Sequence, residues 1–453
     1  MLSHYRFTLE LELLSDLHLG TGETVKLSEL RKSNHGASDD ADPEVSVTAK
    51  DGSGMPYLTA TAIKAAARRL VLGAGQEDLC DKLFGKINST PTYRKGAVEV
   101  STNEGRMGRL SFGYGRMVHA RSELPPLPLY DAKTRCWIST RTRIDGATGT
   151  VKRHHLFNRE YVVAQTRFEV DCIFTGTAKE VADDLGILLG LIKKAGYLAI
   201  GQGSRFGSGR IKLGNTCIKG MMTTFDPVTF SIKNQDMSVA PIESDDVVSA
   251  PQKTWHLALR ATAPFLIADP YGRGGEDDEK GANNVIHALR TPQGGPALPP
   301  SSLFGVLRAR AVWLASLENP DHRDDPDLKP SAWSSGADLS VTERLFGVSG
   351  WRGTLELDAI VDTADNGYVK KFSGIAIDRF SGGVIDGALF SVEAFCHAAF
   401  RVGLKLCARG SGTQEEEAFV SRLVKAVIRD GLEIGHGTNS GFGWFNVVEG
   451  EKK

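Results

Sequence analysis

The chain lacks the features of a membrane, secreted or disulfide-bonded protein. It has no apolar run of eighteen residues and no basic N-terminal segment followed by an apolar stretch, which argues against a membrane span or a secretory leader. Its six cysteines never approach C-x-x-C spacing, so the sequence predicts neither a zinc site nor a disulfide frame. These absences predict a cytoplasmic protein with reduced cysteines and no membrane partner.

Charge of either sign is not in excess, since 54 Lys and Arg face 55 Asp and Glu. The chain as a whole is therefore not drawn to nucleic acid, although a local basic strip is enough to meet a phosphate backbone. Glycine is abundant, with 50 residues, and much of it lies in loops that occur twice.

One series of landmarks is present in two copies. An Ile-Asp pair is followed by Leu-Phe and, fifteen residues after the Asp, by Glu, first from Asp145 to Glu160 and then from Asp378 to Glu393. Such matched spacing indicates a tandem duplication. Pro56 and Pro296, 240 residues apart, begin similar helix entries, and both halves end in Gly-x-Gly-x-x-x-Gly-x-Gly.

The repeat divides the chain into a first domain at 1–215, a Pro-rich and acidic linker at 216–252 and a second domain at 253–453. Each copy predicts an edge-facing strand, a long polar loop, a helix, irregular strands, a second helix, a Gly loop and a last strand. Thr61 and Ser301 are candidate caps of the first helices. The patterns Thr177-x-x-Glu180 and Thr413-x-x-Glu416 are typical of capping boxes at the second helices. This order predicts an α+β fold of two tandem ferredoxin-like domains with large loop insertions.

The Gly loops do not fit a dinucleotide-binding fingerprint, because their spacing differs and a strand follows them. Two interpretations stay open. The glycines allow two strands to cross closely, or bare backbone N–H groups at Gly203, Gly207, Gly437 and Gly441 approach a phosphate chain.

The most basic stretch is residues 141–155, which predicts a hairpin with Gly149 at its tip. It is either a solvated face or an RNA contact. Its cations are Arg141, Arg143, Lys152 and Arg153. His154 and His155, with His436 in the second Gly loop, are either acid–base residues or ordinary polar surface. The loop after the first strand carries Asp39, Asp40 and Asp42, which either solubilise it or meet a divalent ion or an attacking hydroxyl.

Four segments in this order, present in both halves, resemble the RAMP superfamily, and more narrowly the backbone subunits of type III CRISPR effector complexes. They are Leu17-His18-Leu19-Gly20, the helix entry from Pro56 to Arg68, the segment from Arg143 to Glu160, and the Gly loop. The double copy resembles the fused subunits of type III-D complexes. The resemblance implies ferredoxin-like (RRM-like) palms, thumb-like hairpins, and partners that are guide RNA, target RNA and other effector subunits.

In the family, an Asp in the loop after the first strand cuts guide-paired target RNA. Asp42-Pro43-Glu44-Val45 fits that place, with Asp40 and Asp39 as alternates. The resemblance implies a divalent metal ion, magnesium or manganese, transiently held at Asp42. Copy two has Ala282 at the corresponding position, unless Asp277 or Asp278 replaces it in a shifted register. Lys64 becomes Phe304 and Arg143 becomes Ala376, whereas Arg68 and Arg308 are both kept.

We therefore expect an endoribonuclease that acts within a ribonucleoprotein complex and cuts through the first domain, the second being inactive. Phosphates would be positioned by Lys64, Arg68, Arg141, Arg143, Lys152, Arg153 and Arg308. Two alternatives remain: a non-catalytic RNA scaffold, and a metal-independent guide-processing ribonuclease that uses His154, His155 or His436.

Overall fold

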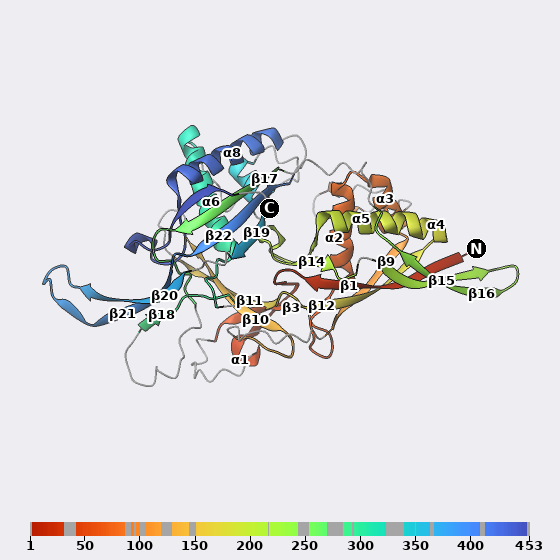
Figure 1. Ribbon diagram of the computed structural model, residues 1–453, viewed down its shortest axis with the longest axis horizontal. Coiled ribbons are helices and arrows are strands. Elements are labelled where there is room, and N and C mark those ends of the chain that lie inside the picture. The colour runs from red at the N-terminus through yellow and green to blue at the C-terminus, as the bar shows by residue number, and fades with distance from the viewer. Residues whose placement is uncertain are drawn as a thin grey trace.

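The computed structural model shows two domains side by side (Figure 1). It describes residues 2–30, 42–86, 92–94, 97–99, 105–118, 129–144, 151–215, 217–242, 253–269, 284–291, 294–322, 339–348, 350–362, 367–407 and 413–450. Within these residues no helix is both long and apolar enough to span a membrane.

The first domain is built on an antiparallel sheet in the order β14-β1-β12-β9. Helices α2, α3 and α5 lie over one face of it (Figure 1). Taken in chain order, the strands stand as 4-1-3-2, which is the ferredoxin-like arrangement. The bounds are β1 (Leu2–Leu13), β9 (Leu110–Val118), β12 (Arg167–Thr175), β14 (Arg210–Leu213), α2 (Ala60–Gly73), α3 (Glu77–Phe84) and α5 (Gly186–Ala195).

The second domain repeats this topology. Its sheet runs β19-β22-β17-β24, which is the same chain order read from the other side, and its helices are α6, α7 and α8. The two tandem ferredoxin-like domains predicted from the sequence are thus confirmed. The bounds are β17 (Lys253–Ala261), β19 (Leu355–Asp362), β22 (Ala399–Leu406), β24 (Trp444–Glu449), α6 (Pro300–Glu318), α7 (Val341–Phe346) and α8 (Thr413–Asp430).

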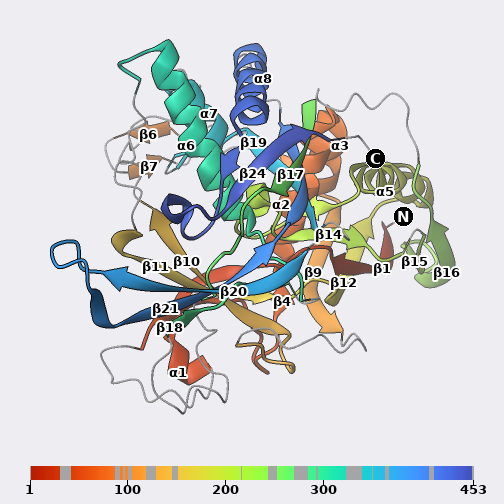
Figure 2. The same ribbon diagram turned by 60° about the vertical axis from the view of Figure 1, so that its left-hand side comes forward.

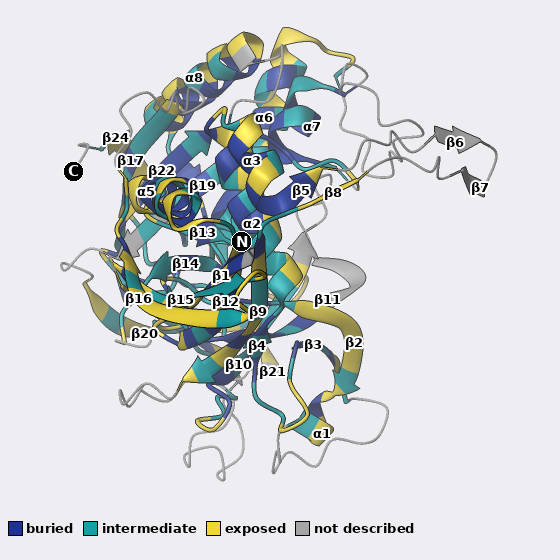
Figure 3. Ribbon diagram, turned by 90° about the vertical axis from the view of Figure 1, so that its right-hand side faces the viewer, coloured by how far each residue is buried: buried dark blue, intermediate teal, exposed yellow. Residues whose placement is uncertain are grey.

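Alternation along β1 explains how the first sheet forms its core. Tyr5, Phe7, Leu9, Leu11 and Leu13 are buried on the helix-covered face, and the side chains between them face outward. Figure 3 shows the buried residues gathered between helices and sheet. The expected edge position of the first strands is wrong, because β1 pairs with β12, β14 and β15, and β17 pairs with β22 and β24. An alternating pattern shows that one face of a strand is exposed to solvent, but it does not show whether an edge of the strand lacks a hydrogen-bonded neighbour.

The predicted linker is partly structured. Strands β15 (Ile218–Asp226) and β16 (Ser231–Val239) form a hairpin, and β15 pairs with β1 from Leu2 to Phe7. Residues 218–239 therefore extend the sheet of the first domain. Ile242 then packs against the helix that contains Gly186 and Gly190, while residues 243–252 lie outside the described part.

Each domain carries a second, smaller sheet that includes its long hairpin. In the first domain the order is β10-β11-β3-β2, and in the second it is β18-β21-β20. Figure 2 shows the β20–β21 hairpin extending away from the second domain. The bounds are β2 (Gly20–Lys26), β3 (Glu44–Thr48), β10 (Cys136–Ile144), β11 (Val151–Val162), β18 (Asn284–Ile286), β20 (Tyr368–Ile377) and β21 (Val384–Cys396).

The remaining elements are short. They are α1 (Leu27–Leu30), β4 (Tyr57–Leu58), β5 (Gly85–Lys86), β6 (Thr92–Arg94), β7 (Ala97–Glu99), β8 (Arg106–Met107), α4 (Ala178–Glu180), a π-helical turn (Val181–Leu185), β13 (Leu198–Ala199), β23 (Leu432–Glu433) and two 3₁₀ turns at Ser204–Phe206 and Thr438–Ser440.

The helix caps follow the predictions only in part. Thr177 and Glu180 form the expected capping box. Thr61 and Ser301 are not caps, because Thr59 caps α2 and Pro299 precedes α6. Both predictions placed the helix start too late.

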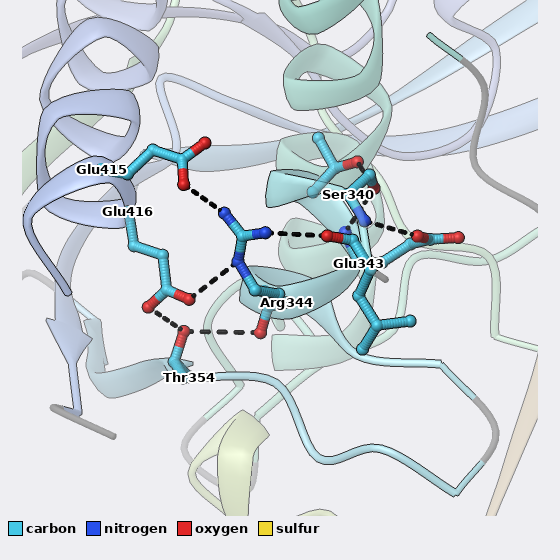
Figure 4. Close-up of polar contacts among 8 residues, drawn as sticks. Ser340, Glu343, Arg344, Thr354, Glu415 and Glu416 are labelled. Atoms are coloured by element: carbon cyan, nitrogen blue, oxygen red, sulfur yellow. Dashed lines mark hydrogen bonds and ion pairs between the residues drawn. The ribbon is translucent and has the colours of Figure 1, made fainter. Parts of the chain in front are cut away.

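The Glu416 carboxylate contacts α7 and the segment that follows it, whereas the side chain of Thr413, its expected capping partner, lies outside the described part. It accepts a hydrogen bond from Thr354 at 3.1 Å and lies 3.4 Å from Arg344, which also pairs with Glu415 (Figure 4). A second capping box, Ser340 with Glu343, begins α7 beside it.

Candidate functional site

Glu160 and Glu393, the glutamates shared by the two copies, bind the segment that follows the long loop of each domain. Glu160 is fully buried, and its carboxylate lies 2.8 Å from Lys50 Nζ and accepts a 3.3 Å hydrogen bond from the Thr48 backbone N–H. Glu393 contacts Arg290 at 3.1 Å, and Arg290 stands 240 residues after Lys50. The landmark Glu of each copy is therefore an anchor for the segment that follows the loop.

Backbone pairing shows that the two copies match residue by residue at this place. Val45 of β3 faces Asn158 of β11 in parallel, and Val285 of β18 faces Ser391 of β21 in the same way. Equivalent residues of the two copies are thus 240 positions apart in the strand after the loop and 233 positions apart in the hairpin, and the two pairs occupy the same place in their sheets.

Asp42 stands at the base of the loop in the first domain, just before β3. Its carboxylate accepts hydrogen bonds from the Ser28 backbone N–H at 3.1 Å and from the Ser28 hydroxyl at 2.5 Å. The Ser28 hydroxyl lowers the pKa of Asp42 below its ordinary value, so the carboxylate is ionised at neutral pH. Asp39 and Asp40 lie outside the described residues, as do Ala282, Asp277 and Asp278 of the second domain.

Polar contacts that the sequence pattern does not predict surround the segment after the first strand. The ring of His18 is 1% exposed, and its Nδ1 donates to the backbone carbonyl of Glu160 at 2.7 Å. Burial lowers the pKa of His18. Asp16 accepts hydrogen bonds from Trp137 Nε1 at 3.1 Å and from the Ala164 N–H at 2.9 Å. These contacts tie the end of the first strand to the hairpin, and only the segment containing His18 hinted at them.

The predicted cations of the helix entries lie on α2 and α6. Lys64 is half-buried on α2, and Arg68 lies close enough to the Cys80 thiol to lower its pKa, although burial raises that pKa more strongly. Arg308 of α6 donates to the Gly347 carbonyl at 2.9 Å, where α7 ends. Arg308 thus has a structural role besides any contact with RNA.

Strands β10 and β11 form the predicted basic hairpin, pairing antiparallel from Cys136 to Ile144. Arg141 is half-buried, with its guanidinium carbon 5.4 Å from the Tyr161 ring centroid. Gly149, Asp145 and the side chains of Arg143, Lys152, Arg153, His154 and His155 lie outside the described part.

The corresponding hairpin of the second domain, β20–β21, exposes apolar and basic side chains together. Phe380, at the turn, is 88% exposed, and Arg379 lies 5.3 Å from its ring centroid. Asp378 accepts hydrogen bonds from the backbone N–H groups of Phe380 and Ser381. Its role in the described structure is to shape the turn.

The outer glycines of both Gly loops permit a close crossing of chain segments. A Cβ atom on Gly201 would lie 2.5 Å from the His18 carbonyl oxygen, and one on Gly435 would lie 2.3 Å from that of Leu266. This supports the interpretation of the glycine pattern as a tight crossing. Gly203, Gly207, Gly437 and Gly441 all have φ between 76° and 83° and flank the 3₁₀ turns.

The first Gly loop is where the two domains touch. Phe206 stacks edge-on against Phe304 with ring centroids 4.9 Å apart, and Arg205 donates to the Phe346 carbonyl at 2.7 Å. Arg210 donates to the Leu357 carbonyl. Phe304, the residue that replaces Lys64 in copy two, is thus part of the contact between domains. In the second loop Asn439 and Ser440 are exposed.

The RAMP superfamily matches this chain twice, over residues 10–212 and again over 258–446. The chain therefore belongs to the RAMP superfamily, as a tandem member. The family implies a CRISPR-associated function in RNA binding. No curated protein matches the chain.

Proposed function

We propose that the chain is a backbone subunit of a type III CRISPR effector complex, of the III-D-like fused kind, that binds guide RNA and cleaves the paired target in its first domain. The observation that carries the proposal is Asp42, an ionised carboxylate at the base of the long loop in a domain of the RAMP superfamily. Its partners would be guide RNA, target RNA and other subunits of the complex, in the cytoplasm.

The chemistry would be attack of the target's own 2′-hydroxyl on the adjacent phosphate. Asp42 would accept a hydrogen bond from that hydroxyl and align it with the phosphorus, and such alignment supplies a large part of the rate. Arg141 and Lys64, with the cations of the hairpin, would hold neighbouring phosphates.

A divalent ion fits this site in a limited way. Among the described residues no group of three or more His, Cys, Asp or Glu could hold a metal ion. Magnesium commonly takes one or two carboxylates and completes its shell with phosphates and water, so Asp42 would serve as a single protein ligand. Such an ion would stabilise negative charge on the reacting phosphate.

The test is target cleavage by the assembled complex carrying Asp42→Asn. The amide oxygen keeps an acceptor for the Ser28 N–H, so we expect guide binding to remain and cutting at the sites served by this subunit to be lost. Glu44→Gln is the matched control, because Glu44 is an exposed carboxylate two residues away. Unchanged cutting in the Asp42→Asn complex would remove Asp42 from the reaction.

A second candidate function is a non-catalytic RNA scaffold. It is favoured by the two hydrogen bonds from Ser28, which show that Asp42 also has a structural use. Target cleavage by the assembled complex distinguishes the two functions, because a scaffold would leave the target RNA intact even without the Asp42→Asn substitution.

A further inference from the structure

The exposed side of α6 carries a stripe of uncharged residues. Exposed residues follow one another there at intervals of four and so lie on one face of the helix. This α6 stripe consists of Gly305, Ala309, Trp313 and Leu317. Trp313 is 42% exposed and Leu317 is 62% exposed. Figure 2 shows α6 beside α8 at the outer end of the second domain, away from the β20–β21 hairpin.

The corresponding helix of the first domain lacks this stripe. α2 begins at Ala60 and α6 at Pro300, again 240 residues later, but α2 has 14 residues and α6 has 19. The residue that matches Ala309 is the exposed Arg69, and α2 ends at the position that matches Trp313. The two copies therefore share the helix, whereas the uncharged stripe and the added length belong to the second domain alone.

Gly305 occupies a position where glycine is unfavourable. In an exposed helix interior glycine costs about 1 kcal/mol relative to alanine. A Cβ atom on Gly305 would meet no other atom of the described chain within 4 Å, so no contact among the described residues requires the missing side chain. Glycine at such a place allows another chain to approach the backbone closely. Together with the small side chain of Ala309, it leaves a notch in the stripe.

Trp313 is the large side chain of the stripe, and a cation holds its ring. The guanidinium carbon of Arg310 lies 4.2 Å from the Trp313 ring centroid, and Arg310 also pairs with Asp430. The ring therefore loses little freedom when a partner covers it, which favours binding. Because Asp430 neutralises Arg310, two such faces can meet without strong repulsion between their arginines.

We propose that the α6 stripe binds the same stripe of a second copy of the chain, with the two helices antiparallel and crossing at Ala309. Trp313 of each copy then fills the notch at Gly305 of the other, because both residues lie four positions from Ala309. A parallel pair would place one Trp313 against the other and leave both notches empty. Antiparallel helix dipoles also attract each other.

The size of the contact sets its strength. Stable interfaces commonly bury about 800 Å² on each partner, and one helix face supplies only part of that area. We therefore expect a weak dimer, with a dissociation constant on the order of 10 μM. This association does not depend on RNA cleavage by the first domain.

The experiment is sedimentation velocity of the full chain without RNA, at concentrations from about 1 to 100 μM. We expect monomer at the low end and dimer at the high end. Trp313→Ala removes the large side chain and Gly305→Leu fills the notch, so each should weaken the dimer by about tenfold or more. Ala65→Leu is the matched control, because Ala65 is exposed at the corresponding position of α2 and should leave the dimer unchanged.

Two further measurements separate the contact from misfolding. Gly305→Leu should raise the melting temperature of the monomer, because leucine is the better helix former, although it weakens the dimer. The double variant Gly305→Leu with Trp313→Ala exchanges the large and the small side chain. It should recover most of the lost affinity, because the introduced leucine of one copy then meets the introduced alanine of the other.

Three results would overturn the proposal. The first is a monomer at every concentration, and the second is a dimer that both single variants leave intact, since it would use another surface. The third is absence of recovery in the double variant, which would refute the antiparallel pairing. A different protein that binds the monomer and is lost with Trp313→Ala would assign the α6 stripe to that partner instead.

Discussion

Glu160→Gln should destabilise the protein far more than the equivalent Glu393→Gln. Glu160 is fully buried and the Lys50 side chain is 22% exposed, so the substitution leaves an ammonium group without its counter-charge in a largely water-excluded place. Removing one partner of a buried ion pair costs about 3–5 kcal/mol. The glutamine oxygen still accepts from Thr48, which puts our expectation near the lower end, at about 3 kcal/mol.

The copy in the second domain supplies an internal comparison. There Glu393 is 24% exposed and its partners His287 and Arg290 are 37% and 45% exposed, so water screens the pair and its loss costs about 1 kcal/mol or less. For a domain of this size, 1 kcal/mol shifts the melting temperature by about 2–4 °C. Glu160→Gln should therefore lower Tm by about 6–12 °C, against about 4 °C or less for Glu393→Gln.

Differential scanning calorimetry of both variants and the parent chain measures these shifts. Adding Lys50→Met to Glu160→Gln removes the uncompensated charge and should recover most of the lost stability. Equal shifts for the two glutamates, or no recovery in the double variant, would refute the reasoning that burial sets the strength of the anchor.

Other predictions test the domain contact, a helix cap and the exposed hairpin. Phe206→Ala removes the ring that packs on Phe304 and should broaden the distance distribution in small-angle scattering while each domain stays folded; an unchanged distribution would contradict that role. The capping box and Arg109 lower the pKa of Glu180 from 4.5 to about 2, so its stabilising effect is present above the unfolded-state pKa and is lost as pH falls toward 2. Thr177→Ala should remove about 1 kcal/mol and flatten that acid dependence in urea unfolding. Phe380→Ser should weaken RNA binding by about 1–3 kcal/mol if the ring stacks on a base, with no change in Tm because the ring is 88% exposed.

The spacing of residues along the chain predicts the structure correctly where the two domains share the same framework of strands and helices. The distances from Asp378 to Glu393 and from Asp145 to Glu160 predicted the duplication, and the structure shows Glu160 and Glu393 as equivalent anchors. The alternation of β1 predicted a strand correctly but not its central place, because alternation depends on the two faces of a strand and pairing depends on its two edges.

Contacts between distant segments were not predictable in this way. The Gly pattern does not reveal that its first copy meets Phe304, because that contact depends on how two folded domains sit together. In the sequence Phe304 is only a departure from Lys64 of the first copy, whereas in the structure it is an aromatic contact between the domains. For Asp42 the sequence supplied the residue, whereas Ser28, which holds its carboxylate, came from the fold.

The sequence by itself determined that this chain is a repeated α+β domain and which residues the two copies share, because periodic patterns and fixed spacings are properties of order along a chain. Tertiary structure alone decided what the shared and altered residues do. A carboxylate such as Glu160 or Glu393 acquires its role from the charge and exposure of its neighbours, and those neighbours lie more than a hundred residues away in the chain.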